Sequence, residues 1–267
     1  MRVLAIGAHP DDVEILCSGT LALCAERGDQ VFIAIATNGD VGTGDPAITR
    51  EQIAAIRHAE AKKSVATIGA TLIWMGFDDE WLFNNLETRT RFIDAIREAR
   101  PDVMIIHDAN DYHPDHRIAG EIARDCRIPA SVPLVKTKFP ETPIPTVFAM
   151  DTLLGNSFEP EIYVNVSPVI ETKKKMLLCH DSQAAWLQHV YGTQITDNML
   201  MKITKDIKKI FQYSTNGDLI RIFHSAKQAA RELNTTEKHI ISAFRLNKTK
   251  GLASLGYIWG YENEPIR

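Results

Sequence analysis

The stretch that decides the fold opens the chain and reads Met1-Arg-Val-Leu-Ala-Ile-Gly-Ala-His-Pro-Asp-Asp12. Residues 3–6 are a short apolar run typical of a buried strand, and Gly7 allows the backbone to turn where the run ends. An imidazole and two carboxylates follow directly: His9, Asp11 and Asp12. A buried strand that ends in polar side chains predicts the carboxyl edge of an open α/β sheet, where such sheets bind their ligands.

Two interpretations of this polar loop are open. His9 and Asp12 are three residues apart, so on a loop that enters a helix both side chains can turn toward one metal ion. The neighbouring Asp11 must then point elsewhere. The alternative is an ordinary helix N-cap, in which Asp11 or Asp12 accepts hydrogen bonds from backbone N–H groups.

A second polar stretch favours the metal ion. His107-Asp-Ala-Asn-Asp-Tyr-His-Pro-Asp-His116 also follows a strand-like run, residues 103–106. It offers two histidines and a carboxylate between them: His113, Asp115 and His116. One histidine and one carboxylate of the first loop, with one histidine of the second, make a two-His, one-carboxylate set with open positions. Such a set suits catalytic Zn²⁺ and equally Fe²⁺.

At these residues the chain resembles a known family. Ala8-His-Pro-Asp-Asp-Val-Glu14 together with His113-Pro-Asp-His116 looks like the PIG-L/LmbE-type zinc deacetylases, which remove acetyl groups from N-acetylglucosamine-containing substrates. Shorter matches extend the resemblance over about residues 1–205: Gly19-Thr-Leu21, Arg57-His-Ala-Glu60, Ile68-Gly69 and Met176-Leu-Leu-Cys-His-Asp-Ser-Gln183. The chain departs from the family at Ser18, where many members carry glycine, and after Lys208, where the usual pocket-closing segment is not found.

The resemblance implies an amide hydrolysis at an acetamido sugar, with Zn²⁺, Fe²⁺ or another divalent ion as cofactor. The expected metal ligands are His9, Asp12 and His116. Asp11 is expected to act as the general base and later as the acid for the leaving amine. His113 is expected to stabilise the oxyanion, and Asp115 to hold His113 in the required tautomer.

Two further residues are candidates for binding the sugar. Arg57 matches the family, but its spacing from Glu60 is equally typical of an exposed ion pair on one helix face. Asp78 follows a strand and is expected to face the site. The Gly-rich loop at residues 37–45 is interpreted as a flexible connection rather than a substrate contact, and His180 as a structural histidine near the site.

Alternating strands and helices predict an α/β fold with a Rossmann-like, doubly wound, mostly parallel sheet. The expected strands are residues 3–6, 30–36, 72–75, 103–106, 146–151 and 162–166. The expected helices are residues 15–27, 48–66, 87–99, 116–126 and 168–179, with further helix toward 209. Residues 128–145 carry five prolines and predict an irregular excursion.

The composition suggests two modules, residues 1–209 and 210–267. The net charge is −4, yet residues 211–267 hold eight Lys and Arg against five Asp and Glu, so the tail carries +3 and the rest −7. The four cysteines are scattered and indicate reduced core residues of a cytoplasmic protein. Because the sequence opens on a strand-like run, we expect no signal peptide, and we expect no membrane span because no apolar run is long enough.

The tail has its own pattern. Asn216-Gly217 predicts a hairpin turn, and residues 226–233 and 235–244 predict two capped helices of helix-turn-helix proportions. The tail resembles the helix-turn-helix repeat at the ends of intron-encoded homing nucleases in three short motifs: Asn216-Gly-Asp-Leu-Ile220, Phe223-His-Ser-Ala-Lys-Gln-Ala-Ala230 and Gly256-Tyr-Ile-Trp259. That resemblance implies DNA contact through the second helix, which offers Lys238, His239, Ser242 and Arg245. The alternative is a small module that only packs on the sheet domain.

Two other functions stay open beside the deacetylase. A metal-dependent hydratase or lyase acting on a small acid could use the same activated water, and it predicts cationic rather than acidic residues around the site. A non-catalytic DNA-binding or regulatory protein is the other alternative, because the family's usual closing segment is missing. We also expect a homo-oligomer.

Overall fold

The computed structural model describes residues 1–152, 158, 160–183, 210–213, 219–223, 233 and 258–261. The chain divides into two compact units, Met1–Thr204 and Lys205–Arg267. The predicted boundary at residue 209 stays a prediction. No helix within the described ranges is long and apolar enough to cross a lipid bilayer.

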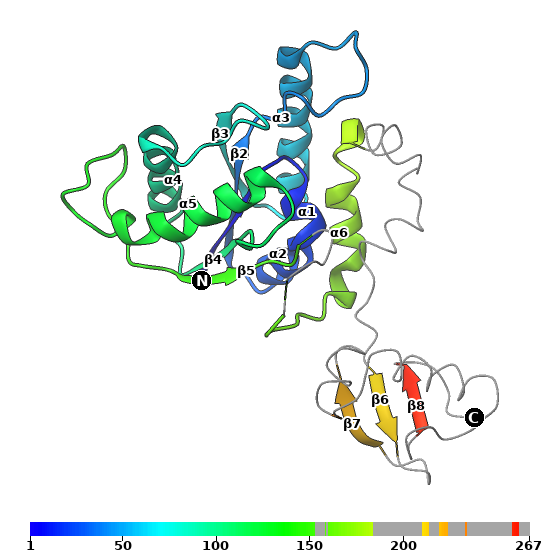
Figure 1. The fold of residues 1–267 in the computed structure, drawn as a ribbon. Helices are drawn as coiled ribbons and strands as arrows, with labels where there is room; N and C mark the ends of the chain where they lie inside the picture. Colours follow the sequence, from blue (N-terminus) through cyan, green and yellow to red (C-terminus); the bar gives the residue numbers. More distant parts are fainter. Residues whose placement is uncertain are drawn as a thin grey trace. The chain divides into compact units, whose positions relative to one another are not determined.

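A five-stranded sheet forms the centre of the first unit (Figure 1). Its strands are β1 (Arg2–Gly7), β2 (Gln30–Thr37), β3 (Thr71–Phe77), β4 (Val103–Ile106) and β5 (Thr146–Ala149). They lie in the order β3-β2-β1-β4-β5, and every neighbouring pair is parallel. Alternation of strands with crossover helices produces this arrangement, so the predicted doubly wound α/β fold is confirmed.

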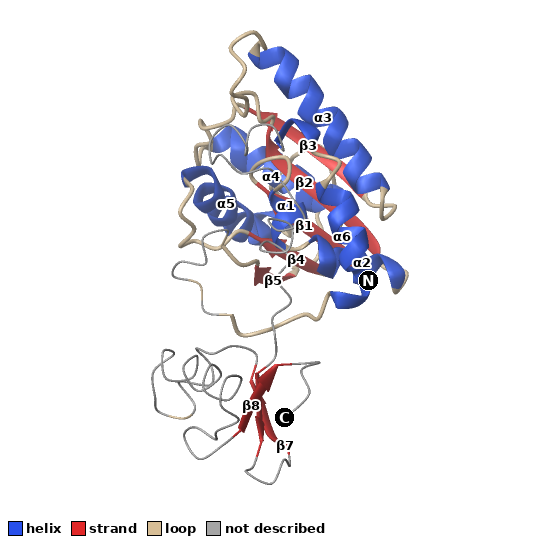
Figure 2. Cartoon of the chain, turned by 90° about the vertical axis from the view of Figure 1, so that its right-hand side faces the viewer, coloured by secondary structure: helices blue, strands red, loops and turns tan. Residues whose placement is uncertain are grey.

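Helices cover both faces of the sheet (Figure 2). They are α1 (Asp12–Leu16), α2 (Ser18–Glu26), α3 (Arg50–Ala66), α4 (Leu86–Ala99), α5 (Pro114–Ala130) and α6 (Ile170–Leu177), the last preceded by a 3₁₀ turn at Ser167–Val169. Leu4 and Ile6 of β1 pack with α4 and α5 in one core cluster, whereas Val3 and Ala5 pack with α1, α2, α3 and α6 in the other. Successive strand residues face opposite sides, so helices on both sides bury β1 from Val3 to Gly7, and its residues 3–6 are all apolar.

The strand order places the two polar loops side by side. The chain runs outward from β1 through β2 to β3, then returns to the other side of β1 as β4, so the direction of winding reverses between β1 and β4. In the register of this pair, Ile6 lies opposite Ile106. The loops that begin at Gly7 and His107 therefore leave the same edge at adjacent strands, where doubly wound sheets form their ligand crevice.

Two predicted elements differ from the structure. The helix expected at residues 15–27 is split at Cys17, because Ser18 Oγ donates a hydrogen bond to the Glu14 carbonyl oxygen at 2.7 Å, the back-bonding that bends helices. The strand expected at residues 162–166 is wrong. These residues join neither described sheet, and Ile162 and Val164 expose 63% and 42% of their surface, so the alternating pattern faces solvent instead of a partner strand.

A buried arginine organises the proline-rich excursion that follows α5. Arg97 of α4 is 3% exposed and donates hydrogen bonds to the carbonyl oxygens of Ala130, Val132, Val135 and Phe139, among others. An irregular segment leaves its backbone carbonyls without regular partners, and the guanidinium fork supplies five donors for them. The excursion thereby keeps a defined course without regular secondary structure, as predicted.

The second unit contains a separate antiparallel sheet. Its strands are β6 (Ile210–Tyr213), β7 (Leu219–Phe223) and β8 (Ile258–Tyr261), in the order β7-β6-β8. The pairing of β6 with β7 is the hairpin expected from Asn216-Gly217, although the turn itself lies outside the described residues. The predicted helices of the tail, with Lys238, His239, Ser242 and Arg245, lie outside the described residues as well.

Candidate metal centre and active site

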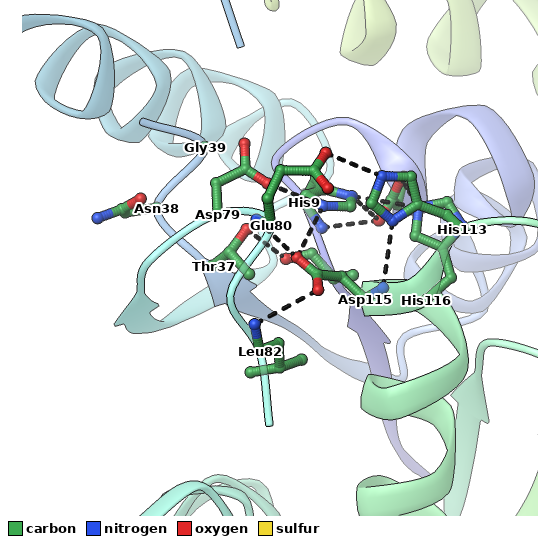
Figure 3. Close-up of polar contacts among 12 residues, drawn as sticks. His9, Thr37, Asn38, Gly39, Asp79, Glu80, Leu82, His113, Asp115 and His116 are labelled. Atoms are coloured by element: carbon green, nitrogen blue, oxygen red, sulfur yellow. Dashed lines mark hydrogen bonds and ion pairs between the residues drawn. The ribbon is translucent and has the colours of Figure 1, made fainter. Parts of the chain in front are cut away.

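The two loops bring the expected metal ligands into contact. His9 Nδ1 lies 3.1 Å from His116 Nε2 and 3.3 Å from Asp12 Oδ2, and His116 Nε2 lies 3.2 Å from Asp12 Oδ1. All three residues are at most 9% exposed. Figure 3 shows the imidazoles of His9 and His116 facing each other beside His113. Residues 107 positions apart in sequence therefore present three ligand atoms to one point.

The donor set fits a tetrahedral divalent ion. Ligands about 2.0–2.1 Å from Zn²⁺ in tetrahedral geometry lie about 3.3 Å from one another, close to the three measured separations. Burial opposes protonation of His116, but Asp12 and the hydrogen bond with Asp111 outweigh it and raise the pKa to about 9. Burial likewise opposes protonation of His9, and Asp12 leads the groups that raise its pKa well above the ordinary value. The negative potential behind these shifts also attracts a metal cation, which displaces the protons on binding.

Overlapping clusters surround this set. Among the residues that the structure describes, three groups have ligand atoms within 4.8 Å of one another: His9 with His113 and His116, Asp12 with His107 and His116, and His9 with Asp79 and Asp115. Buried carboxylates at one site are stable only when cations compensate them. The buried carboxylates of these groups therefore favour a bound cation. Which of the residues would be its ligands stays a prediction.

Asp11 lies in different surroundings from Asp12. Its backbone has a φ of 115°, which is rare for a residue other than glycine, and its side chain makes no capping hydrogen bond to α1. The N-cap alternative for Asp11 is therefore excluded. Burial raises the pKa of Asp11 to about 6, against the opposing effect of Arg57, whose Nη2 lies 3.3 Å from Oδ1. A carboxyl group with such a pKa can accept and return a proton near neutral pH.

Arg57 is buried and links the first polar loop to the Gly-rich loop by hydrogen bonds. Its guanidinium donates to the Pro10 carbonyl oxygen at 2.6 Å and to the Gly39 carbonyl oxygen at 3.3 Å, and its side chain is 4% exposed. The exposed ion pair with Glu60 is therefore wrong, because Glu60 instead accepts hydrogen bonds from Ser182. The sugar-binding role of Arg57 stays a prediction.

The Gly-rich loop packs directly on this arginine. Gly39 has a φ of +66°, and a Cβ atom added there would lie 2.5 Å from Arg57 Nη1. A Cβ atom on Gly42 would collide with the same nitrogen, and Gln183 Nε2 donates to the Gly42 carbonyl oxygen at 3.1 Å. The loop therefore packs closely against the Arg57 side chain, whereas the sequence suggested only a flexible connection.

Asp79, rather than Asp78, lies at the polar cluster. His9 Nε2 lies 3.0 Å from Asp79 Oδ1, and Asp79 is 4% exposed (Figure 3). The Asp78 side chain is 67% exposed and lies 3.9 Å from Arg50 Nη2. Consecutive residues at a strand end point to opposite sides, so a shift of one position exchanges the two carboxylates. The sugar-binding role of Asp78 stays a prediction, but its side chain does not join the cluster.

The contacts of His113 and Asp115 differ from those expected. The Asp115 carboxylate accepts hydrogen bonds from the backbone N–H groups of Glu80 at 2.9 Å and Leu82 at 3.4 Å, and it lies 3.5 Å from His9 Nε2. His113 Nδ1 accepts from the Asp115 backbone N–H, and its Nε2 lies 3.2 Å from Glu80 Oε1. Asp115 thus anchors the loop after β3, and Glu80 is the carboxylate beside His113, as Figure 3 shows.

Four residues at the site were not predicted from the sequence: Asp79, Glu80, His107 and Asp111. His107 is buried, its ring stacks on His116 at 4.2 Å between centroids, and its Nε2 lies 3.1 Å from Asp12 Oδ2. Asp111 lies 3.0 Å from His116 Nδ1. Both stand in the quoted second polar stretch, so the density of acids and imidazoles there was the available signal.

His180 is a buried neighbour of the first loop, as its structural interpretation predicted. It is 1% exposed, and its Nε2 lies 3.4 Å from Oε1 of Glu14, which also accepts a hydrogen bond from Ser64 Oγ at 2.6 Å. Burial opposes protonation of His180, and Glu14 outweighs it and raises the pKa. His180 belongs to none of the three metal-type clusters.

Sequence profiles of two families match separate parts of the chain. The profile of the GlcNAc-PI de-N-acetylase family, PIG-L, matches residues 4–127, and that of the NUMOD1 domain matches residues 208–243. The first span contains both polar loops with His9, Asp12 and His116. The second begins beside β6 and covers the hairpin.

Named proteins and solved structures also resemble the chain. The diacetylchitobiose deacetylase of Thermococcus kodakarensis is 28% identical over 190 residues, which cover 68% of this chain and 70% of that protein. The probable N-acetyl-alpha-D-glucosaminyl L-malate deacetylase 2 of Bacillus anthracis is 28% identical over 194 residues, 69% of this chain and 82% of that protein.

Among solved structures, the N,N'-diacetylchitobiose deacetylase of Pyrococcus horikoshii superposes with a TM-score of 0.64 at 24% identity, covering 75% of this chain and 76% of that one. The 4-carboxy-2-hydroxymuconate hydratase GalB of Pseudomonas putida superposes with a TM-score of 0.65 at 18% identity, covering 99% of this chain and 97% of that one. These likenesses show the fold. The profile match and the paired polar loops together show that the chain, over residues 4–127, contains a domain of the PIG-L family.

Proposed function

We propose that this protein is a metal-dependent hydrolase that removes an acetyl group from an acetamido sugar of the N-acetylglucosamine type. The observation that carries the proposal is the convergence of His9, Asp12 and His116 beside Asp11, within a domain whose relatives are named as deacetylases. The bound cation, Zn²⁺ or another divalent ion such as Fe²⁺, would lower the pKa of a water molecule and polarise the acetyl carbonyl group.

Side chains of the protein transfer the proton of the attacking water and stabilise the charge that develops on the acetyl oxygen. Asp11, with its pKa raised to about 6, takes the proton of the attacking water and returns it to the leaving amine. His113 lies on the exposed side of the cluster, with rings 4.7 Å from His9 and 4.8 Å from His116, and donates to the oxyanion. Arg57 holds Asp11 in place, and the buried Asp79 borders the space in which the sugar would bind.

Acetate release tests the proposal. The purified protein, loaded in turn with Zn²⁺ and Fe²⁺, is incubated with N-acetylglucosamine, N,N'-diacetylchitobiose and an N-acetylglucosaminyl malate, and acetate and free amine are measured. We expect release from at least one acetamido sugar and its loss after removal of the metal with a chelator. No acetate from any of these substrates with either metal would contradict the proposal.

The hydratase alternative has weaker support. The solved hydratase shares the fold at 18% identity, which does not carry its reaction to this chain. That alternative predicts cationic side chains around the site, where the described buried charges are mainly carboxylates, with Arg57 engaged by loop carbonyls and Asp11. The matching control incubates the same protein with a small unsaturated dicarboxylic acid. Its hydration is measured as a loss of the acid's ultraviolet absorbance.

DNA contact by the second unit is a separate proposal. It is supported by the NUMOD1 match at residues 208–243, by the resemblance to homing-nuclease repeats and by the tail's charge of +3. Duplex DNA should bind the full chain, and affinity should fall steeply with salt. Replacing Lys238, Arg245, Lys248 and Lys250 with alanine should reduce the slope of log affinity against log salt by about 0.9 for each phosphate that is no longer neutralised.

The control for that experiment is replacement of Lys62 and Lys63, two exposed lysines of α3, which should leave DNA affinity unchanged. Equal behaviour of the two variants would contradict DNA contact by the tail. A cytoplasmic location is supported by the four cysteines, all of which are free thiols. The homo-oligomer stays a prediction.

A further inference from the structure

The two ring nitrogens of His116 face different partners. Nε2 points to the ligand cluster, 3.1 Å from His9 Nδ1 and 3.2 Å from Asp12 Oδ1. Nδ1 points away from that cluster and lies 3.0 Å from Asp111 Oδ1. The imidazole therefore bridges the cluster and a carboxylate that is not part of it.

Asp111 is built into the loop before α5. It is 2% exposed, and its Oδ1 also accepts the backbone N–H of His113 at 3.0 Å. Its own backbone N–H donates to the Asp108 carbonyl oxygen, and Arg117 Nη1 donates to its carbonyl oxygen at 2.9 Å. Both main-chain groups and Oδ1 are thus held, so the carboxylate has a defined position before any metal binds.

A carboxylate in this position determines the tautomer of the histidine. A neutral imidazole carries one N–H, and an ionised carboxylate can only accept a hydrogen bond. With a cation engaging Asp12 and Nε2, the neutral imidazole keeps its single proton on Nδ1, where Asp111 accepts it, and Nε2 offers its lone pair to the cation. Metal-binding histidines need that lone pair, and an outer carboxylate on the opposite nitrogen increases their basicity as ligands.

We propose that Asp111 is a positioning residue that holds His116 as the Nδ1-protonated tautomer with Nε2 directed at the cation, and so sets the affinity for the metal. The inference rests on the metal site of the proposed function.

A purely structural role is the competing explanation. In that case Asp111 would only tie the loop together through the His113 N–H, and its loss would lower the stability of the metal-free protein without changing the histidine tautomer. The two roles separate because tautomer and metal affinity report on His116 Nδ1, whereas thermal unfolding of the metal-free protein reports on the loop.

The test compares Asp111→Ala and Asp111→Asn with Asp108→Asn. Asp108 is a matched control on the same loop, and its carboxylate accepts only the local Asn110 backbone N–H among the described hydrogen bonds. Zn²⁺ affinity is measured by competition with a chromophoric chelator. We expect Asp111→Ala to weaken it about 10–100-fold, Asp111→Asn to weaken it less because its amide oxygen still accepts the N–H, and Asp108→Asn to leave it unchanged.

Nitrogen-15 chemical shifts of the His116 ring give the second measurement, in metal-free protein at a pH where the imidazoles are neutral. Asp111 and Asp12 face opposite ring nitrogens of His116, so the share of the Nδ1-protonated tautomer should fall in Asp111→Ala, which leaves only the Asp12 carboxylate, at Nε2. Wild-type Zn²⁺ affinity and an unchanged tautomer in both Asp111 variants would overturn the inference. Because neither measurement uses acetate release, a protein that binds Zn²⁺ but hydrolyses no acetamido sugar would refute the proposed function and leave this inference standing.

Discussion

Replacing His116 with alanine should abolish tight binding of a divalent cation, and deacetylation with it, while the chain still folds. His116 is predicted to supply one of three ligand atoms, and the three candidate atoms lie 3.1–3.3 Å apart. Without it, His9 and Asp12 would offer only two ligands, and water would have to fill the other positions of the ion. His116 lies in the first turn of α5, and the buried apolar residues of that helix, Ala119, Ile122 and Ala123, are unchanged in the variant. Metal content by mass spectrometry after dialysis, with circular dichroism as the folding control, measures the outcome.

His113→Ala is the matched comparison for this variant. His113 also lies close to His9 and His116, and these three form an alternative ligand group. If His113 stabilises the oxyanion, its variant should retain one ion per chain and lose turnover. Loss of metal from the His113 variant together with full occupancy of the His116 variant would reverse the two assignments.

Replacing Asp11 with asparagine should lower turnover about 10²–10⁴-fold and leave the metal bound, since that is the usual contribution of a general acid–base group. Asparagine keeps the size of the side chain and an oxygen for Arg57 Nη2, but it cannot take a proton. Steady-state kinetics of acetate release, combined with metal analysis of the same sample, measure both quantities. Substrate affinity should change little.

Asp12→Asn provides the contrast at the adjacent position. Asp12 lies among three imidazoles, and His116, followed by His9, leads the groups that lower its pKa well below the ordinary value in spite of burial. Its variant should therefore lose the metal, unlike the Asp11 variant. If Asp11→Asn loses the metal and Asp12→Asn keeps it, the two carboxylates have been given each other's roles.

The fold was predictable because its signals are local. Residues 3–6 and 103–106 are apolar throughout, as strands covered on both faces must be, and the intervening helices carry apolar residues at helical spacing. The strand expected at 162–166 shows the limit of this reasoning. Alternation makes a segment compatible with a strand, but a strand also needs a partner, and pairing is decided elsewhere in the molecule.

The sequence predicted the site residues that directly follow the strand ends. It did not predict the side chains that contact them. His9, Asp12 and His116 stand in two short polar loops, and parallel topology alone brings such loops to one edge of the sheet. By contrast, whether Asp78 or Asp79 faces the site depends on where β3 ends, because a shift of one residue turns the other side chain toward the site.

By itself the sequence determined the α/β class, the two polar loops and the residues that can hold a cation, because composition and strand periodicity act over a few residues. Only the tertiary structure decided that Arg57 is buried between Pro10 and Gly39, and that Asp111 lies behind His116. Those contacts depend on distances of a few tenths of an ångström between separate elements. Hydrogen bonds and ligand bonds form only within such distances, and no local pattern encodes them.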